Sequence, residues 1–361
     1  MNKRKSIVFD IISALVGFGL FLAIVLTNNF TVGKNIFVCC LWILLGAIFW
    51  FVIITFVHEL GHLISGKING FAFVSLSVMC FRWKKVGKEV LFSFCKPTDE
   101  AGYTELVPKY SDQLKERFTK VTASGYSTSL ILVVLGAIPL IIDVPSTIFC
   151  LTCTLLPLTV YMVLDSVLPK ISGSIRNDGG VIKSLKMDDD WSKVLLSILT
   201  IQSELYNGKT YSEIDKSLYF DLPQLCEDDV NFINLLLLRY YYFLDVSDYD
   251  NAKKTIKRLK SLVDYMPDSF YYHISAEELY SKCTFDYDED LADELMYELE
   301  DYLNNNNTVE NVRTKLAYLE NVVKENDDLT DFYNKFTREA KRLVLSGQKE
   351  FELKLIKSIK K

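Results

Sequence analysis

The sequence predicts a mainly α-helical protein in two parts. Residues 1–184 should form a polytopic membrane bundle of about four helices with a small membrane-associated β-hairpin or sheet, and residues 185–361 a soluble α-helical repeat domain, or α-solenoid. All apolar stretches long enough to cross a bilayer lie in the first part. The net charge divides at the same place, since the first part carries about +6 and the second about −12 of the total of −6.

Four apolar stretches are the candidate membrane spans. They cover residues 11–27, 36–64, 121–142 and 147–168. No small-residue cleavage site follows the first stretch, so we expect it to be retained as a span.

The distribution of lysine and arginine predicts the orientation of these spans, because cytoplasmic loops are enriched in positive charge. Lys3, Arg4 and Lys5 precede the first span, and nine cations lie between residues 82 and 120, before the third span, whereas residues 27–35 and 143–146 hold one lysine together. We therefore expect a multi-pass cell-membrane protein with both termini in the cytoplasm. The high usage of Lys, Asn, Ile and Tyr is typical of low-GC bacteria, so a bacterial source is expected.

Residues 71–94 alternate between apolar and polar with period two around the turn sequence KKVGKE, which predicts a β-hairpin. Open strand edges are not tolerated in lipid, so this hairpin should lie in a cavity lined by helices or at the cytoplasmic interface. The cysteines do not suggest a disulfide framework. Cys150 and Cys153 have the spacing of a redox or metal pair, but no second pair accompanies them.

The most informative motif is HELGH, which places two of the three histidines of the chain, His58 and His62, inside the second span. Ionisable groups at membrane depth are costly and usually functional. The i,i+4 spacing puts both imidazoles on one helix face, which suits two ligands of a tetrahedral Zn²⁺. Glu59 then lies where a general base could act on a water molecule. The alternative is that the two histidines only make hydrogen bonds between helices.

A zinc site needs a third protein ligand, for which Asp178 in the sequence NDGG is the strongest candidate. Two glycines follow Asp178 and would allow close approach of the backbone to the metal. Asp165 within the fourth span is the rival, while Asp143 is expected on the opposite side of the membrane.

The order of motifs resembles the site-2 protease family of intramembrane metalloproteases. The resemblance covers roughly residues 51–182. After HELGH the small residue, lysine and glycine of that family correspond to Gly66, Lys67 and Gly70, and its next strand to AGYTEL at residues 101–106.

Two later motifs of the family are only partly present. Its G-P-x-x-N element corresponds to GYSTS, where Gly125 matches but Tyr126 and Ser129 replace proline and asparagine. Its N-x-x-P and DG elements correspond to SVLP from Ser166 and to Asp178-Gly179.

The resemblance implies that His58, His62 and Asp178 hold one Zn²⁺ per chain and that Glu59 is the general base. The substrate would be a membrane protein, cut within or beside a transmembrane segment near the cytoplasmic face, as in regulated intramembrane proteolysis or the removal of signal-peptide remnants.

Two other functions stay open. One is a membrane HExxH protease whose third ligand is a glutamate, for which the available residues are Glu89, Glu100, Glu105 and Glu116. The other is a catalytically inactive membrane scaffold that binds a partner through its helical repeats.

The second part shows a repeat of about 38 residues marked by Tyr211, Tyr249 and Tyr287. Helices are expected at residues 191–205, 212–218, 231–244, 251–266, 269–282, 289–303, 309–324 and 329–345. Paired helices at this period resemble degenerate tetratricopeptide-type repeats, which implies a domain that recruits a substrate or a protein regulator. Its acidic charge disfavours nucleic acid as a partner.

Overall fold

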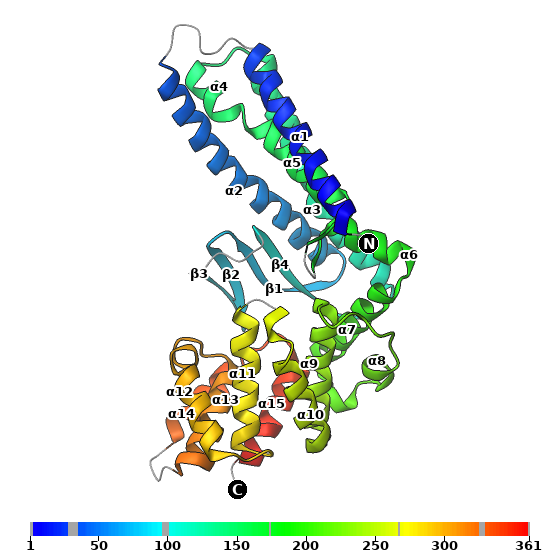
Figure 1. Ribbon diagram of the computed structural model, residues 1–361, viewed down its shortest axis with the longest axis vertical. Helices are drawn as coiled ribbons and strands as arrows, with labels where there is room; N and C mark the ends of the chain where they lie inside the picture. The colour runs from blue at the N-terminus through cyan, green and yellow to red at the C-terminus, as the bar shows by residue number, and fades with distance from the viewer. Residues whose placement is uncertain are drawn as a thin grey trace. The chain divides into compact units, whose positions relative to one another are not determined.

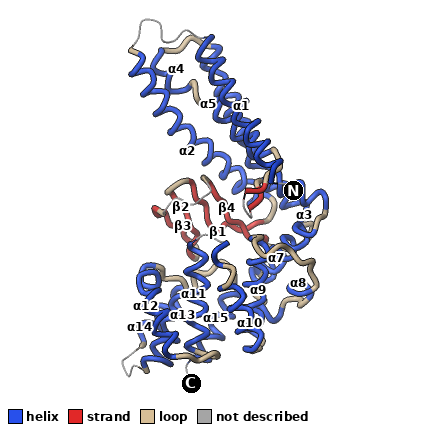
Figure 2. Tube along the Cα trace, viewed as in Figure 1, coloured by secondary structure: helices blue, strands red, loops and turns tan. Residues whose placement is uncertain are grey.

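The computed structural model describes residues 3–27, 35–95, 101–172, 175–265, 268–324 and 329–359, and these are mainly helical with a small sheet (Figures 1 and 2). Contacts between Cα atoms divide the chain into two compact units. The first unit comprises Met1–Lys84, Val90–Leu106 and Gln113–Asp189, and the second comprises the rest of the chain.

The helices of the first unit include four segments long and apolar enough to cross a membrane: Ser6–Thr27, Ile36–Ile68, Leu114–Ile141 and Ser146–Val167. The prediction of four candidate spans is therefore confirmed. The helices themselves are α1 (Lys3–Thr27), α2 (Ile36–Ile68), α3 (Leu114–Ile141), α4 (Ser146–Thr152), α5 (Leu155–Val167) and α6 (Asp178–Met187). The fourth span consists of α4 and α5, which are separated by a short break.

Large apolar side chains cover the outer faces of these helices. Leu26 is 74% exposed, Phe37 75% and Ile141 81%, each in a helix that is apolar on nearly every face. A helix of this kind is stable where hydrocarbon, not water, surrounds it. The inner faces pack α2 against α3, α4 and α5, while α1 packs on α5, beside which it runs in Figure 1.

A four-stranded sheet follows the C-terminal end of α2, which the sequence predicts to face the cytoplasm. Its strands are β1 (Phe71–Val78), β2 (Phe81–Val86), β3 (Glu89–Phe94) and β4 (Gly102–Pro108), in the spatial order β3-β2-β1-β4 (Figure 2). β1 and β2 are antiparallel, with Val78 opposite Phe81. A further two-stranded ribbon, β5 (Ile171–Ser172) and β6 (Ile175–Arg176), links α5 to α6.

The prediction of one hairpin over residues 71–94 is corrected, because the chain turns twice there. The expected turn occurs at Gly87, whose φ is +63°. An additional turn occurs at Met79, which has a φ of +54° although it is not glycine. Left-handed backbone is uncommon outside Gly, Asn and Asp, so nothing in the local sequence indicated this turn.

The second unit is helical. Its elements are α7 (Asp190–Tyr206), η1 (Tyr211–Glu213), α8 (Ser217–Phe220), α9 (Val230–Asp245), α10 (Tyr249–Lys260), η2 (Val263–Tyr265), α11 (Asp268–Cys283), α12 (Glu289–Asn305), α13 (Val309–Tyr318), η3 (Leu319–Val323), α14 (Thr330–Ala340) and α15 (Ser346–Ile359). The helix expected over residues 212–218 is absent as such, because Ile214 is extended and buries its side chain between η1 and α8.

Helices adjacent in sequence pack together in this unit, as α9 does with α10 and α11 with α12. The final helix α15 also contacts α7 and α13. In a regular solenoid each repeat contacts only its neighbours, so the return of α15 to the first helix of the unit is a departure from that pattern.

A buried ionic group joins three of these helices. Arg313 of α13 is fully buried, with Nη2 2.6 Å from Oε1 of Glu277 and Nε 3.0 Å from Oε2 of Glu352. Glu277 belongs to α11 and Glu352 to α15, and each is 1% exposed. Burial raises the pKa of Glu352 to about 8, and the nearby Arg313 charge only partly opposes this rise.

Candidate metal centre

Helix α2 supplies His58 and His62 to one point of the first unit. Their Nε2 atoms lie 3.2 Å apart, as expected for residues one helical turn apart on the same face. The end of α2 is fixed by Asn69, whose side chain donates to the Ser65 carbonyl and whose own carbonyl accepts from Arg117 of α3. The orientation of the histidine pair is thereby tied to α3.

Asp178, the first residue of α6, brings its carboxylate to the same point. Its Oδ2 lies 3.2 Å from Nε2 of His58 and 3.5 Å from Nε2 of His62. Ser166 near the end of α5 donates a 2.8 Å hydrogen bond to the same oxygen. Each of the three side chains is less than one-fifth exposed. The three residues predicted as metal ligands therefore converge.

The protonation of His62 can be derived from its surroundings. Its Nδ1 lies 2.8 Å from the carbonyl oxygen of Val121, which can only accept, so Nδ1 carries the proton. In the neutral ring Nε2 then presents a lone pair toward Asp178. Converging lone pairs and a carboxylate make a site that favours a cation.

The spacing of the three atoms fits zinc. Zn²⁺ bound at 2.0–2.2 Å in tetrahedral geometry separates its ligand atoms by about 3.3–3.5 Å. The three observed separations are 3.2, 3.2 and 3.5 Å. Two imidazole nitrogens and one carboxylate oxygen also match the donors of catalytic zinc sites. Within the part of the chain that the structure describes, this is the one group of three or more such side chains close enough to share an ion.

Glu59 lies next to the triad and is held by β4. It is 6% exposed, and the hydroxyl of Thr104 donates a 2.6 Å hydrogen bond to its Oε2. Gly102, two residues earlier on β4, comes so close that a Cβ atom there would lie 2.7 Å from Oε1 of Glu59. Residues two apart in a strand share a face, so this face of β4 covers the carboxylate.

Gly125 of α3 packs directly against the imidazoles. A Cβ atom at this position would lie 2.5 Å from Nε2 of His62 and 2.6 Å from Nε2 of His58. Glycine is therefore required sterically at this position. It lies within α3 and not at its start, because α3 already begins at Leu114.

The rival ligand Asp165 does not reach the triad. Its carboxylate pairs with Lys170, which also lies 2.7 Å from Oδ1 of Asp10 in α1. The lone carboxylate of the fourth span thus has a cation as its partner. Of the alternative glutamates, Glu105 accepts from Ser75, and Glu100 lies outside the described residues. The candidate metal group contains no glutamate from the described residues.

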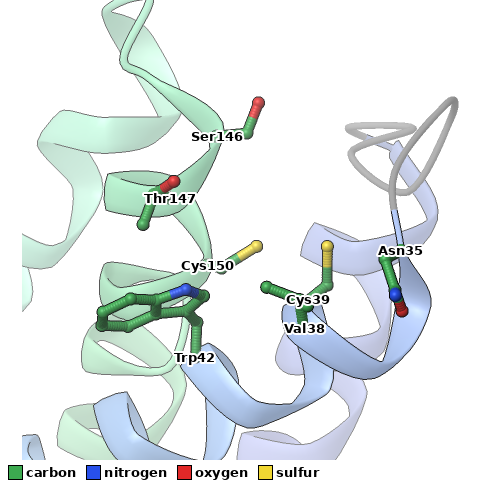
Figure 3. A pocket seen from close by; sticks show the side chains of 7 residues that line it. All are labelled: Asn35, Val38, Cys39, Trp42, Ser146, Thr147 and Cys150. Atoms are coloured by element: carbon green, nitrogen blue, oxygen red, sulfur yellow. The ribbon is translucent and has the colours of Figure 1, made fainter.

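A separate cavity of about 250 Å³ lies between the start of α2 and α4 (Figure 3). Cys39 and Cys150 both line it, together with Trp42, and Cys153 instead directs its Sγ to the Cys150 carbonyl, 3.3 Å away. The cavity is lined by none of the triad residues. It therefore plays no part in the arrangement around His58.

Sequence reasoning did not single out Thr104 or Asn177. Thr104 could have been found from its position two residues after Gly102, on the same face of the expected strand. Asn177 caps α6 and precedes Asp178, and an asparagine before the first helical residue is a recognisable N-cap. Comparisons of this chain with protein families, curated proteins and solved structures found no match.

Proposed function

We propose that the protein is an intramembrane zinc metalloprotease of the site-2 type, with His58, His62 and Asp178 as its zinc ligands. The observation that carries the proposal is the convergence of the three ligand atoms at tetrahedral spacing, with the carboxylate of Glu59 buried beside them. The location of the histidines in an apolar span implies that the peptide bond is cut at membrane depth.

The residues of the chain divide the chemistry between them. When bound, zinc would supply a Lewis acid that polarises the scissile carbonyl and lowers the pKa of a water molecule. Glu59 takes a proton from the attacking water and returns it to the leaving amine. Thr104 occupies Oε2 of Glu59 with a hydrogen bond and so orients the carboxylate, while Oε1 stays on the side of Gly102.

The sheet offers a way to hold a substrate in the extended form that hydrolysis needs. β4 is an edge strand, bonded within the sheet to β1 alone, and its residues Gly102 and Thr104 contact Glu59. An unwound substrate segment that paired with this edge would pass beside the general base. Proline placed in β4 away from Gly102 and Thr104 should abolish cleavage and leave zinc binding unchanged; cleavage at the normal rate would refute substrate pairing.

The rest of the chain fits the same function. The lysines and arginines between the second and third spans favour a cytoplasmic position for both termini and for the metal-site end of α2. The acidic helical unit would then be cytoplasmic, where its paired helices, as a repeat domain, would recruit a substrate or a regulator.

The test compares new protein N-termini in host membranes that express either the wild type or Glu59→Gln. N-termini within apolar spans that occur only with the wild type would establish the protease and identify its substrate. The purified protein should also contain one zinc per chain, and His58→Ala should lose it. A metal-free wild type with an unchanged N-terminal profile would instead favour the inactive scaffold.

A further inference from the structure

The side chain of Asn177 joins the end of α5 to the start of α6. The two hydrogens of its Nδ2 group face three carbonyl oxygens: Asp165 at 2.6 Å, Ser166 at 3.2 Å and Leu168 at 2.7 Å. Its Oδ1 accepts from the backbone N–H of Lys170 at 2.8 Å and of Gly180 at 3.0 Å. One amide thus satisfies orphan carbonyls of one helix and an orphan N–H of the next.

These bonds determine where the following residue lies. Asp178 is covalently next to Asn177, and its carboxylate meets two histidines that belong to a different helix. Gly179 packs so closely on the end of α5 that a Cβ atom would lie 2.1 Å from the Val167 carbonyl oxygen. The backbone of Asp178 is therefore held against α5 from both sides, and α5 itself packs on α2 and α3.

We infer that Asn177 is a positioning residue for the third metal ligand, an inference that rests on the proposed zinc site. Its donated bonds fix the Asp178 backbone relative to α5, so the carboxylate is already in place before the ion binds. Residues that do not touch the metal but orient its ligands by hydrogen bonds contribute about 10–100-fold to metal affinity.

A helix cap alone would not need this arrangement. Capping α6 uses only the hydrogen bond from the Gly180 N–H group to Oδ1 of Asn177. The side-chain oxygen of serine or aspartate would accept this bond equally well. The contacts with the carbonyl oxygens at the end of α5 require the NH2 group of an amide. Asn177→Ser therefore keeps the cap and removes most of the link to α5, and Asn177→Asp keeps the acceptor and removes all donors.

The test measures zinc affinity of the purified full-length protein in detergent by competition with a chelator. Asn177→Ser should bind zinc about 10–100-fold more weakly than the wild type. It should also shift the visible absorption of bound Co²⁺, which reports the ligand geometry. The matched control is Asn35→Ser, since Asn35 caps α2 through its bond from Phe37 N–H and lies far along that helix from His58.

An Asn177→Ser protein with wild-type zinc affinity and Co²⁺ spectrum would overturn the inference, even if its melting temperature fell. If this variant does not fold, Asn177→Asp is judged by the same two measurements. A wild type that binds no zinc would refute the proposed site as well, which distinguishes failure of the proposed function from failure of the positioning role alone.

Discussion

The hydroxyl of Thr104 lies 2.6 Å from Oε2 of Glu59, and this bond connects the edge strand β4 to the metal-site helix α2. A second, 3.2 Å bond from the same hydroxyl reaches the main-chain carbonyl of Glu59. The strand therefore fixes both the backbone and the carboxylate of the proposed general base.

Thr104→Val should lower kcat/KM about 10–100-fold without loss of zinc. A hydrogen bond to a charged group contributes about 1.5–3 kcal/mol, which corresponds to a factor of that size in rate. The measurement is cleavage of a substrate identified from the N-terminal profiles, with zinc content determined on the same sample. Thr119→Val, which loses only a bond within α3, should cleave normally; equal activity in both variants would refute the role of Thr104.

Gly125→Ala should abolish zinc binding. The added methyl group would overlap Nε2 of both histidines, and both are held in place by the packing of α2 on α3. Metal analysis of the purified variant tests this expectation. Gly19→Ala in α1 is the control, because a Cβ atom there has no neighbour within 4 Å. Stoichiometric zinc in Gly125→Ala would mean that the two helices are not packed as described.

Asp178→Asn should weaken zinc binding by more than about a hundredfold, since it removes a ligand and not only a supporting group. Asp165→Asn should keep its zinc, because the Asp165 carboxylate faces Lys170 and not the histidines. Chelator competition on the two variants decides between them. The opposite ranking would make Asp165 the third ligand.

The helical unit should lose stability as pH rises between about 4.5 and 8. Glu352 has its pKa raised to about 8 in the folded chain, so the folded state holds a proton that the unfolded state has released over this interval. The free energy of unfolding should therefore fall across it, by an amount on the order of a few kcal/mol. Glu352→Gln should remove this dependence and be the more stable protein at pH 8.

Trp191 allows this last measurement on the full chain. It is buried at the start of α7, and the other three tryptophans, all in the first unit, can be replaced by phenylalanine. Denaturant unfolding at pH 5 and pH 8 can then be followed by Trp191 fluorescence. Glu350→Gln, a change at an exposed position two residues earlier in α15, is the control and should keep the wild-type pH dependence.

Local sequence patterns predicted the features that depend only on residues close together in the chain. The span containing His58 could be predicted because its helix is apolar over many turns, and the i,i+4 spacing placed both imidazoles on one face. The third span was predicted to begin at residue 121, whereas the helix that contains it begins at Leu114, because its first turns are charged and contribute nothing to an apolar pattern. The chain also turns at Met79, although methionine is not a residue type that favours turns.

Long-range contacts could not be predicted in the same way. Asp178 and Asp165 were both plausible ligands from sequence. The structure distinguishes them, because Asp178 meets the two histidines whereas Asp165 pairs with Lys170, which also lies close to Asp10 of the first helix. The contacts of the Asn177 side chain with α5 and α6 are equally invisible in the sequence. Zinc binding and proteolysis themselves stay predictions.

The return of α15 to α7 and α13 has a consequence for biogenesis. Chains fold from their N-terminal domain during synthesis, and Glu352 leaves the ribosome roughly forty residues after Arg313, with Phe351 beside it. Until then the positions that Phe351 and Glu352 fill stand open, and the guanidinium of Arg313 lacks one of its two carboxyl neighbours. A translational stall before α15 would therefore leave an incomplete helical unit attached to the four apolar helices of the first unit, with apolar positions exposed that the complete chain buries.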